Sequence, residues 1–187
     1  MARSAIFRMP SPLSIVARSS TITNAFVISI IPVVVPTEAE IMEALRILEM
    51  DPADVRCAYC GDRFTEWDHL RPLVVAQRPT GYISEIGNLV PACGKCNQSK
   101  GNKGWRTWIV SDAERSPKTR TVPDLEQKIR RLTAFERWSP RDPIKFEKAV
   151  GSELWKEYWD SWQKVLALCK ASHEIALRIR AALGSDK

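Results

Sequence analysis

Apolar residues recur at helical spacing on both sides of the middle of the chain. The stretches with this spacing are residues 41–50, 105–109, 124–138 and 152–183. The last stretch contains no proline and no interior glycine, so we expect one long helix that Ser152 caps. The pattern therefore predicts a chain whose middle part is flanked by helices.

An apolar and aromatic stripe runs along the last of these helices. Its members are Trp155, Trp159, Trp162, Leu166 and Cys169. A stripe at helical spacing is typical of a packing face rather than of a platform on which bases stack. The helix could fold back on the rest of the protein, or it could pair with a second copy and form a homodimer. His173 lies near the stripe and is expected to be structural.

The middle of the chain is patterned like short strands. Residues 63–70 are rich in aromatic and β-branched side chains, and residues 86–90 form a second short apolar run. Two prolines and a glycine interrupt the sequence between the runs, which predicts a long loop. After the second run we expect a helical turn that carries Asn97 and Lys100 one turn apart on the same face.

Four cysteines in two Cys-x-x-Cys pairs bracket this strand-like part. Each pair, Cys57/Cys60 and Cys93/Cys96, presents two sulfurs from one short loop, and four thiolates suit a tetrahedral Zn²⁺ ion. The 32 residues between Cys60 and Cys93 exceed the usual spacing, but a hairpin can loop out and return. Disulfides are the alternative. Zinc is favoured because Cys169 has no partner and the basic composition suggests a compartment where thiols stay reduced.

The residues between and beside these two Cys-x-x-Cys pairs, or zinc knuckles, resemble those of a known family. The segments are Cys-Ala-Tyr-Cys-Gly, Trp-Asp-His-Leu-Arg-Pro and Gly-Asn-Leu-Val-Pro-Ala-Cys-Gly-Lys-Cys-Asn-Gln-Ser-Lys-Gly-Asn. Together they resemble the HNH endonucleases, in the zinc-knuckle branch of the ββα-metal nucleases. The resemblance covers residues 56–105, about a quarter of the chain.

The resemblance implies a role for each matching residue. His69 matches the general base that takes a proton from the attacking water, and Asp68 matches a ligand of the single catalytic divalent ion. Asn88 matches the asparagine that ties the long loop and helps to orient the base. Asn97 matches a metal-ligand position that is often a second histidine. An asparagine here, after an Asp-His pair, resembles the HNH domain of RNA-guided CRISPR nucleases. Asn102 is the next candidate for this ligand.

The chemistry of these side chains agrees with such a site. A carboxylate and an amide oxygen are hard ligands, which favours Mg²⁺ or Mn²⁺ over zinc at this second position. An imidazole has an unperturbed pKa near neutrality and suits a base. A lone histidine in a strand is more often structural, and asparagines are often turn or cap residues. It is the surrounding motif that favours the catalytic interpretation.

The charge of the chain points to a polyanionic partner. The formal net charge is +6, and residues 93–131 contain ten Lys or Arg residues but only four Asp or Glu. We expect Lys95, Lys100, Lys103 and Arg106 to contact DNA phosphates, the alternative being a solvated basic surface. Phosphate contacts position a nucleic acid without specifying its sequence.

The composition predicts three regions. Residues 1–36 contain three arginines, six serines and no acidic residue, and we expect a poorly ordered, dispensable extension because Met42 could begin a chain with every motif. Its apolar run is too short for a membrane span. Residues 37–112 should form the nuclease module with its preceding helix, and residues 113–187 a helical region. We expect a cytoplasmic protein of bacterial or phage-like type, with organellar targeting by the first segment as the alternative.

These observations combine into one prediction. The fold is α+β: a ββα-metal motif with a four-cysteine zinc site, flanked by helices. The function is a metal-dependent DNA endonuclease that leaves 5′-phosphate and 3′-hydroxyl ends, as the resemblance implies, in a restriction-type or mobile-element setting. The alternatives are a non-catalytic zinc-stabilised nucleic-acid-binding module and an RNA-directed nuclease.

Overall fold

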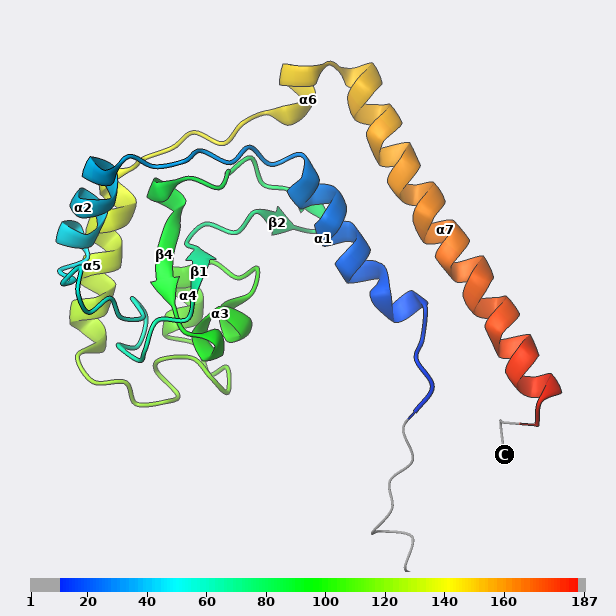
Figure 1. Ribbon diagram of the computed structural model, residues 1–187, viewed down its shortest axis with the longest axis horizontal. Coiled ribbons are helices and arrows are strands. Elements are labelled where there is room, and N and C mark those ends of the chain that lie inside the picture. The colour runs from blue at the N-terminus through cyan, green and yellow to red at the C-terminus, as the bar shows by residue number, and fades with distance from the viewer. Residues whose placement is uncertain (1–10, 185–187) are drawn as a thin grey trace, which may run out of the picture. The chain divides into compact units, whose positions relative to one another are not determined.

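Two short antiparallel strands lie at the centre of the part that carries the motif. A computed structural model describes residues 11–184 and divides them into two packing units: residues 27–149, and residues 11–26 together with 150–184. In the first unit, β1 (Glu66–His69) pairs with β4 (Leu89–Ala92), and His69 lies opposite Leu89. A 3₁₀ turn, η3 (Ile86–Asn88), precedes β4, and α3 (Gly94–Lys100) follows it (Figure 1). The expected order of strand, loop, strand and helix is confirmed.

The long loop between the strands contains a hairpin that the sequence pattern did not predict. Strands β2 (Val74–Val75) and β3 (Arg78–Pro79) pair antiparallel, so that Val75 lies opposite Arg78. The two residues between them, Ala76 and Gln77, both have positive φ, 48° and 62°. A two-residue hairpin turn requires this backbone region, which usually selects Gly or Asn. The absence of those residues hid the turn from sequence reasoning.

Three helices pack around the strand pair and form the core of this unit. They are α2 (Glu38–Ile47), α4 (Trp105–Ile109) and α5 (Leu125–Trp138). A capping box at Thr37 and Glu40 starts α2, three residues before the apolar periodicity begins. The cysteine pairs lie in the same core cluster as several large, fully buried side chains, among them Tyr59, Leu70, Trp108, Leu132 and Phe135. The zinc-type knuckles and the apolar core are therefore one packed structure.

The second unit is built on one long helix. It contains η2 (Val16–Arg18), most of α1 (Ser19–Ser29) and α7 (Ser152–Ala182); the short α6 (Phe146–Val150) precedes α7. Within this unit Trp162 Nε1 donates to Thr23 Oγ1 (3.1 Å), and Tyr158 Oη donates to the carbonyl of Phe26 (2.7 Å). The aromatic stripe is thus a packing face. A homodimer through α7 stays a prediction. Helix α7 begins after Gly151, and Ser152 is its first residue, not its cap.

The segment expected to be a poorly ordered extension has regular structure in its described part. Residues 1–10 lie outside the described residues. Residues 11–36 include η2 and α1, and Val33 forms a β-bridge with Ser84 of the long loop. Residues 113–149, expected to belong with the C-terminal helix, instead group with the motif.

The fold class is confirmed as mixed helix and small sheets with a four-cysteine cluster and a long C-terminal helix. Among residues 11–184, no helix has both the length and the apolar character that crossing a membrane requires.

Candidate active site and metal centres

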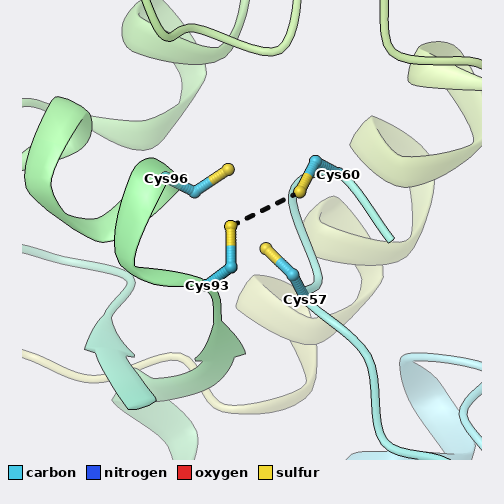
Figure 2. Close-up of side chains that lie close together, drawn as sticks. All are labelled: Cys57, Cys60, Cys93 and Cys96. Atoms are coloured by element: carbon cyan, nitrogen blue, oxygen red, sulfur yellow. Dashed lines mark hydrogen bonds between the residues drawn. The ribbon is translucent and has the colours of Figure 1, made fainter. Parts of the chain in front are cut away.

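The four cysteines converge on one point in the core. Their Sγ atoms all lie within 4.8 Å of one another, and the Sγ atoms of Cys60 and Cys93 are 3.6 Å apart. Figure 2 shows Cys57 and Cys60 reaching in from the first knuckle and Cys93 and Cys96 from the start of α3. A tetrahedral ion with Zn–S bonds of about 2.3 Å requires sulfurs about 3.8 Å apart. The cluster therefore fits zinc.

The sulfurs of this cage need a cation. A hydrogen bond to Cys60 is the largest of the influences that raise the pKa of the Cys57 thiol to about 12. A buried cluster of thiolates without an ion would repel itself, so the geometry is suited to metal and not to free thiols. The described cysteines form no disulfide, which excludes the disulfide interpretation for this structure.

Arg120 lies next to the cage. Its Nη1 donates to Cys96 Sγ (3.4 Å), and its Nη2 donates to Asp62 Oδ2 (2.8 Å). A guanidinium beside a thiolate offsets part of the charge of a four-thiolate site. Sequence reasoning missed this residue because Arg120 is 24 positions after Cys96 and follows no motif spacing.

Asp68 is buried on the face of β1 that packs against α3. Tyr59 Oη donates to its Oδ2 (2.6 Å), and Lys100 Nζ lies 3.1 Å from Oδ2 and 3.2 Å from Oδ1. Lys100 Nζ also donates to the carbonyl of His69 (2.7 Å). Burial raises the pKa of Asp68 against the opposing effect of Lys100, and burial lowers the pKa of Lys100. The carboxylate thus has a cation of its own.

Glu66 and Asn97 lie on the same face. Glu66 is two residues before Asp68 on β1, and its Oε2 accepts from Nδ2 of Asn97 (3.0 Å). A carboxylate only accepts hydrogen bonds, so the NH₂ end of the Asn97 amide faces Glu66. The amide oxygen is therefore left for another partner. Glu66 was missed because no motif position marks it, although the alternation of the strand places it beside Asp68.

His69 lies on the opposite face of β1. Its Nε2 is 2.9 Å from Ser84 Oγ, a residue of the long loop that sequence reasoning did not identify. Burial, with a smaller contribution from the charge of Lys100, lowers the pKa of His69 to about 4. The imidazole is therefore neutral at pH 7, the state that a general base requires.

Asn88 ties the long loop to the end of β1. Its Oδ1 accepts from the amide of Arg71 (2.8 Å), and its Nδ2 donates to the carbonyls of Arg71 and Ile83 (both 3.1 Å). The side chain is 1% exposed, and these three bonds use most of its capacity. Among the described residues, the side chain at hydrogen-bonding distance from the His69 ring is that of Ser84, not that of Asn88.

The four basic residues expected at a DNA surface lie in different surroundings. Lys95 is exposed, and Lys103 is exposed while its Nζ donates to the carbonyl of Ser99. Arg106 forms two hydrogen bonds to Glu136 Oε2 (3.0 and 2.6 Å). Lys100 is 0% exposed and differs from the expectation, because its ammonium neutralises Asp68 in the interior.

The oxygen donors on the α3 side of β1 are of the kind that a small divalent cation prefers. The carboxylate oxygens of Glu66 and Asp68 and the amide oxygen of Asn97 are hard ligands. Each oxygen of Asp68 already accepts a hydrogen bond, but a carboxylate has about four lone-pair positions. An ion held by Asp68 would share that carboxylate with Lys100.

Comparison with known proteins identifies this part of the chain. Residues 57–103 match the model of the HNH endonuclease family, so the segment with the cage, Asp68 and His69 is an HNH endonuclease domain. A similar protein is the CRISPR-associated endonuclease Cas9 of Corynebacterium diphtheriae, 31% identical over 99 residues. That match covers 51% of this chain and 8% of the relative. No solved structure matches the chain.

Proposed function

We propose that this protein is a metal-dependent endonuclease that hydrolyses DNA phosphodiester bonds, with His69 as the general base. Asp68 and Asn97 are the proposed ligands of one Mg²⁺ or Mn²⁺ ion, and the four cysteines hold a structural Zn²⁺. The observation that carries the proposal is the adjacency of a neutral imidazole, His69, and a carboxylate donor, Asp68, at the end of β1. The match of residues 57–103 to the HNH endonucleases supports it.

Each side chain has a defined part in this reaction. His69 accepts a proton from water, because its pKa of about 4 keeps it unprotonated at neutral pH. Tyr59 and Lys100 hold the carboxylate of Asp68 in place, and Glu66 orients the amide of Asn97. When bound, the divalent ion supplies Lewis-acid stabilisation of the negative phosphate oxygens and of the leaving alkoxide. The proposed products carry 5′-phosphate and 3′-hydroxyl ends.

DNA is the proposed substrate, and exposed cations beside the motif supply its attraction. Lys95 and Lys103 are exposed, and the side chain of Arg106 is 50% exposed although it pairs with Glu136. Such contacts to phosphates fix the position of a duplex and carry no sequence information. A restriction-type or mobile-element role is the proposed setting, and sequencing the ends cut from a mixed DNA library would test it.

Cleavage of supercoiled plasmid with Mg²⁺ or Mn²⁺ tests the function. His69→Ala should lower the rate about 10²- to 10⁴-fold, the usual contribution of a general base. His173→Ala removes the other histidine, which lies on α7, and should cut at the full rate. If the wild-type protein binds DNA and never cuts it, the endonuclease proposal fails. Digesting RNA in parallel with DNA separates a DNA nuclease from an RNA-directed one.

One observation favours a second candidate function, a non-catalytic zinc-stabilised module that binds nucleic acid. Lys100 already neutralises Asp68, so this site is charge-balanced without any divalent ion. A module of this kind would bind DNA equally with and without Mg²⁺ and would show no cleavage.

A further inference from the structure

The backbone of Ser84 is held by a segment far from it in the sequence. Its N–H donates to the carbonyl of Pro32 (3.1 Å), and its carbonyl accepts from the N–H of Val34 (2.9 Å). These two bonds flank the parallel bridge between Val33 and Ser84. All four residues belong to the unit of residues 27–149. Ser84 therefore has a fixed place, although it lies in a long loop.

The residues on either side of Ser84 are held as well. The carbonyl of Ile83 accepts from Nδ2 of Asn88 (3.1 Å), and Glu85 is buried and pairs with Arg141 (3.2 Å). A serine hydroxyl has one rotatable bond, so a fixed backbone leaves it only a few positions. One of these places Oγ 2.9 Å from Nε2 of His69. The contact therefore depends on strand β1, which carries His69, on the loop that carries Ser84, and on the distant residues that hold this loop.

The contact decides what the imidazole can do. A neutral imidazole has one N–H and one lone pair, and the partner of one nitrogen determines which nitrogen keeps the lone pair. If Ser84 accepts from Nε2–H, Nδ1 keeps its lone pair and can take a proton from water. If Ser84 donates to Nε2, Nδ1 carries the hydrogen and His69 cannot act as a base.

We propose that Ser84 is a positioning residue that accepts the Nε2–H of His69, and that the Pro32–Val34 segment holds Ser84 in place for this purpose. The inference rests on the proposed function, because it assigns a purpose to the tautomer of a general base. It also gives residues 32–34 a role in the site, in contrast to the dispensable extension that the composition suggested.

Nuclear magnetic resonance of the imidazole nitrogens tests the contact without any cleavage assay. In the full-length zinc-loaded protein, ¹⁵N shifts should show a pyrrole-like Nε2 and a pyridine-like Nδ1 at His69. His173→Gln assigns the signals, because the chain has only two histidines. Ser84→Ala should shift the His69 signals toward a mixture of tautomers. A pyridine-like Nε2 in the wild-type protein would overturn the proposal.

Cleavage kinetics test the consequence. Ser84→Ala should lower kcat about ten- to hundredfold, as is usual for removing a group that orients a functional residue, and leave KM for DNA unchanged. Ser84→Thr keeps the hydroxyl and should restore most of kcat. An unchanged kcat in Ser84→Ala, with a large loss in His69→Ala, would reject the role of Ser84 and leave the nuclease function standing. If the wild-type protein does not cut, the proposed function fails, and the nitrogen shifts still decide the contact.

The role of the Pro32–Val34 segment has its own matched pair of variants. Val34→Pro removes the N–H that donates to the carbonyl of Ser84, whereas Val34→Ala keeps it and changes only a side chain that is 51% exposed. Val34→Pro should lower kcat in the same direction as Ser84→Ala, while Val34→Ala should match the wild type. Equal rates for the two variants would show that the segment does not hold Ser84. Zinc content measured for every variant confirms that the domain is folded.

Discussion

The cysteine cage and the carboxylate face of β1 lie in the same domain, but they balance their charge in opposite ways. The cage gathers four cysteine thiols, and of its described neighbours Arg120 is the cation that touches a sulfur. The carboxylate face has Lys100 buried against Asp68. We therefore expect the cage to need an ion in order to fold and the carboxylate face to fold without one.

This difference suggests two roles for metal ions within about fifty residues: a structural ion in the cage and a catalytic ion at Asp68. A zinc ion in the cage would be part of the core, since the cysteines belong to the same cluster as Leu70 and Trp108. A divalent ion at Asp68 would be an addition to a site that is already neutralised. The protein should thus keep its fold, and lose only its activity, when the second ion is removed.

The largest expected effect is the loss of zinc. Structural zinc contributes about 10–16 kcal/mol of binding free energy, which matches or exceeds the whole stability of an ordinary domain. Zinc chelation or Cys96→Ser should unfold residues 27–149, seen as loss of far-UV circular dichroism and of a cooperative melt. Washing out Mg²⁺ should leave the melting temperature unchanged. A chelated protein that melts as before would show that the cage is not structural.

The next effect is at Lys100. Lys100→Met leaves Asp68 buried without a cation, and breaking a buried pair in this way costs about 3–5 kcal/mol. Urea denaturation should show the loss. The double variant Lys100→Met with Asp68→Asn should recover part of the lost stability, because no charge is then left unpaired. A single variant as stable as the wild type would mean that the face does not depend on its own cation.

A smaller effect is expected at Arg120. Arg120→Met removes the guanidinium from Cys96 Sγ, and the zinc affinity should fall about 10- to 100-fold while the four sulfurs remain. Competition with a chromogenic chelator measures this affinity. Lys118→Met is the matched control, since Lys118 is exposed and pairs with the exposed Asp112, away from the sulfurs. Equal affinities in the two variants would remove Arg120 from the zinc site.

Local sequence signals predicted the cage and the motif, because each depends on residues a few positions apart. The Cys-x-x-Cys pairs and the helical spacing of α5 are of this kind. Ser84, Glu66 and Arg120 escaped because their partners are brought to them only by folding. Ser84 meets His69 through a loop that a distant segment fixes, a contact that no spacing rule describes.

The strand boundaries were wrong for a related reason. The sequence pattern predicted one strand over residues 86–90. Instead, Ile86–Asn88 form a 3₁₀ turn, in which the N–H of Asn88 donates to the carbonyl of Glu85 (2.9 Å). The turn lets the Asn88 side chain reach back to Arg71 and Ile83. A side chain that satisfies its own loop therefore overrode the strand propensity of its neighbours.

The last expected effect is the pH dependence that His69 gives to stability, which appears only on acidification. Its pKa is about 4 in the folded protein and near 6.5 when unfolded, so the unfolded chain binds more protons between these values. Stability from this group is fully present above about pH 6.5 and is lost as the pH falls toward 4. The stabilities of wild type and His69→Gln, measured from melting curves, should run parallel above about pH 6.5, and the wild type should lose more stability as the pH falls toward 4. A constant gap between the curves would mean that the folded imidazole titrates as in the unfolded chain. His69 would then lack the buried, neutral state that distinguishes it from the thiols of the cage.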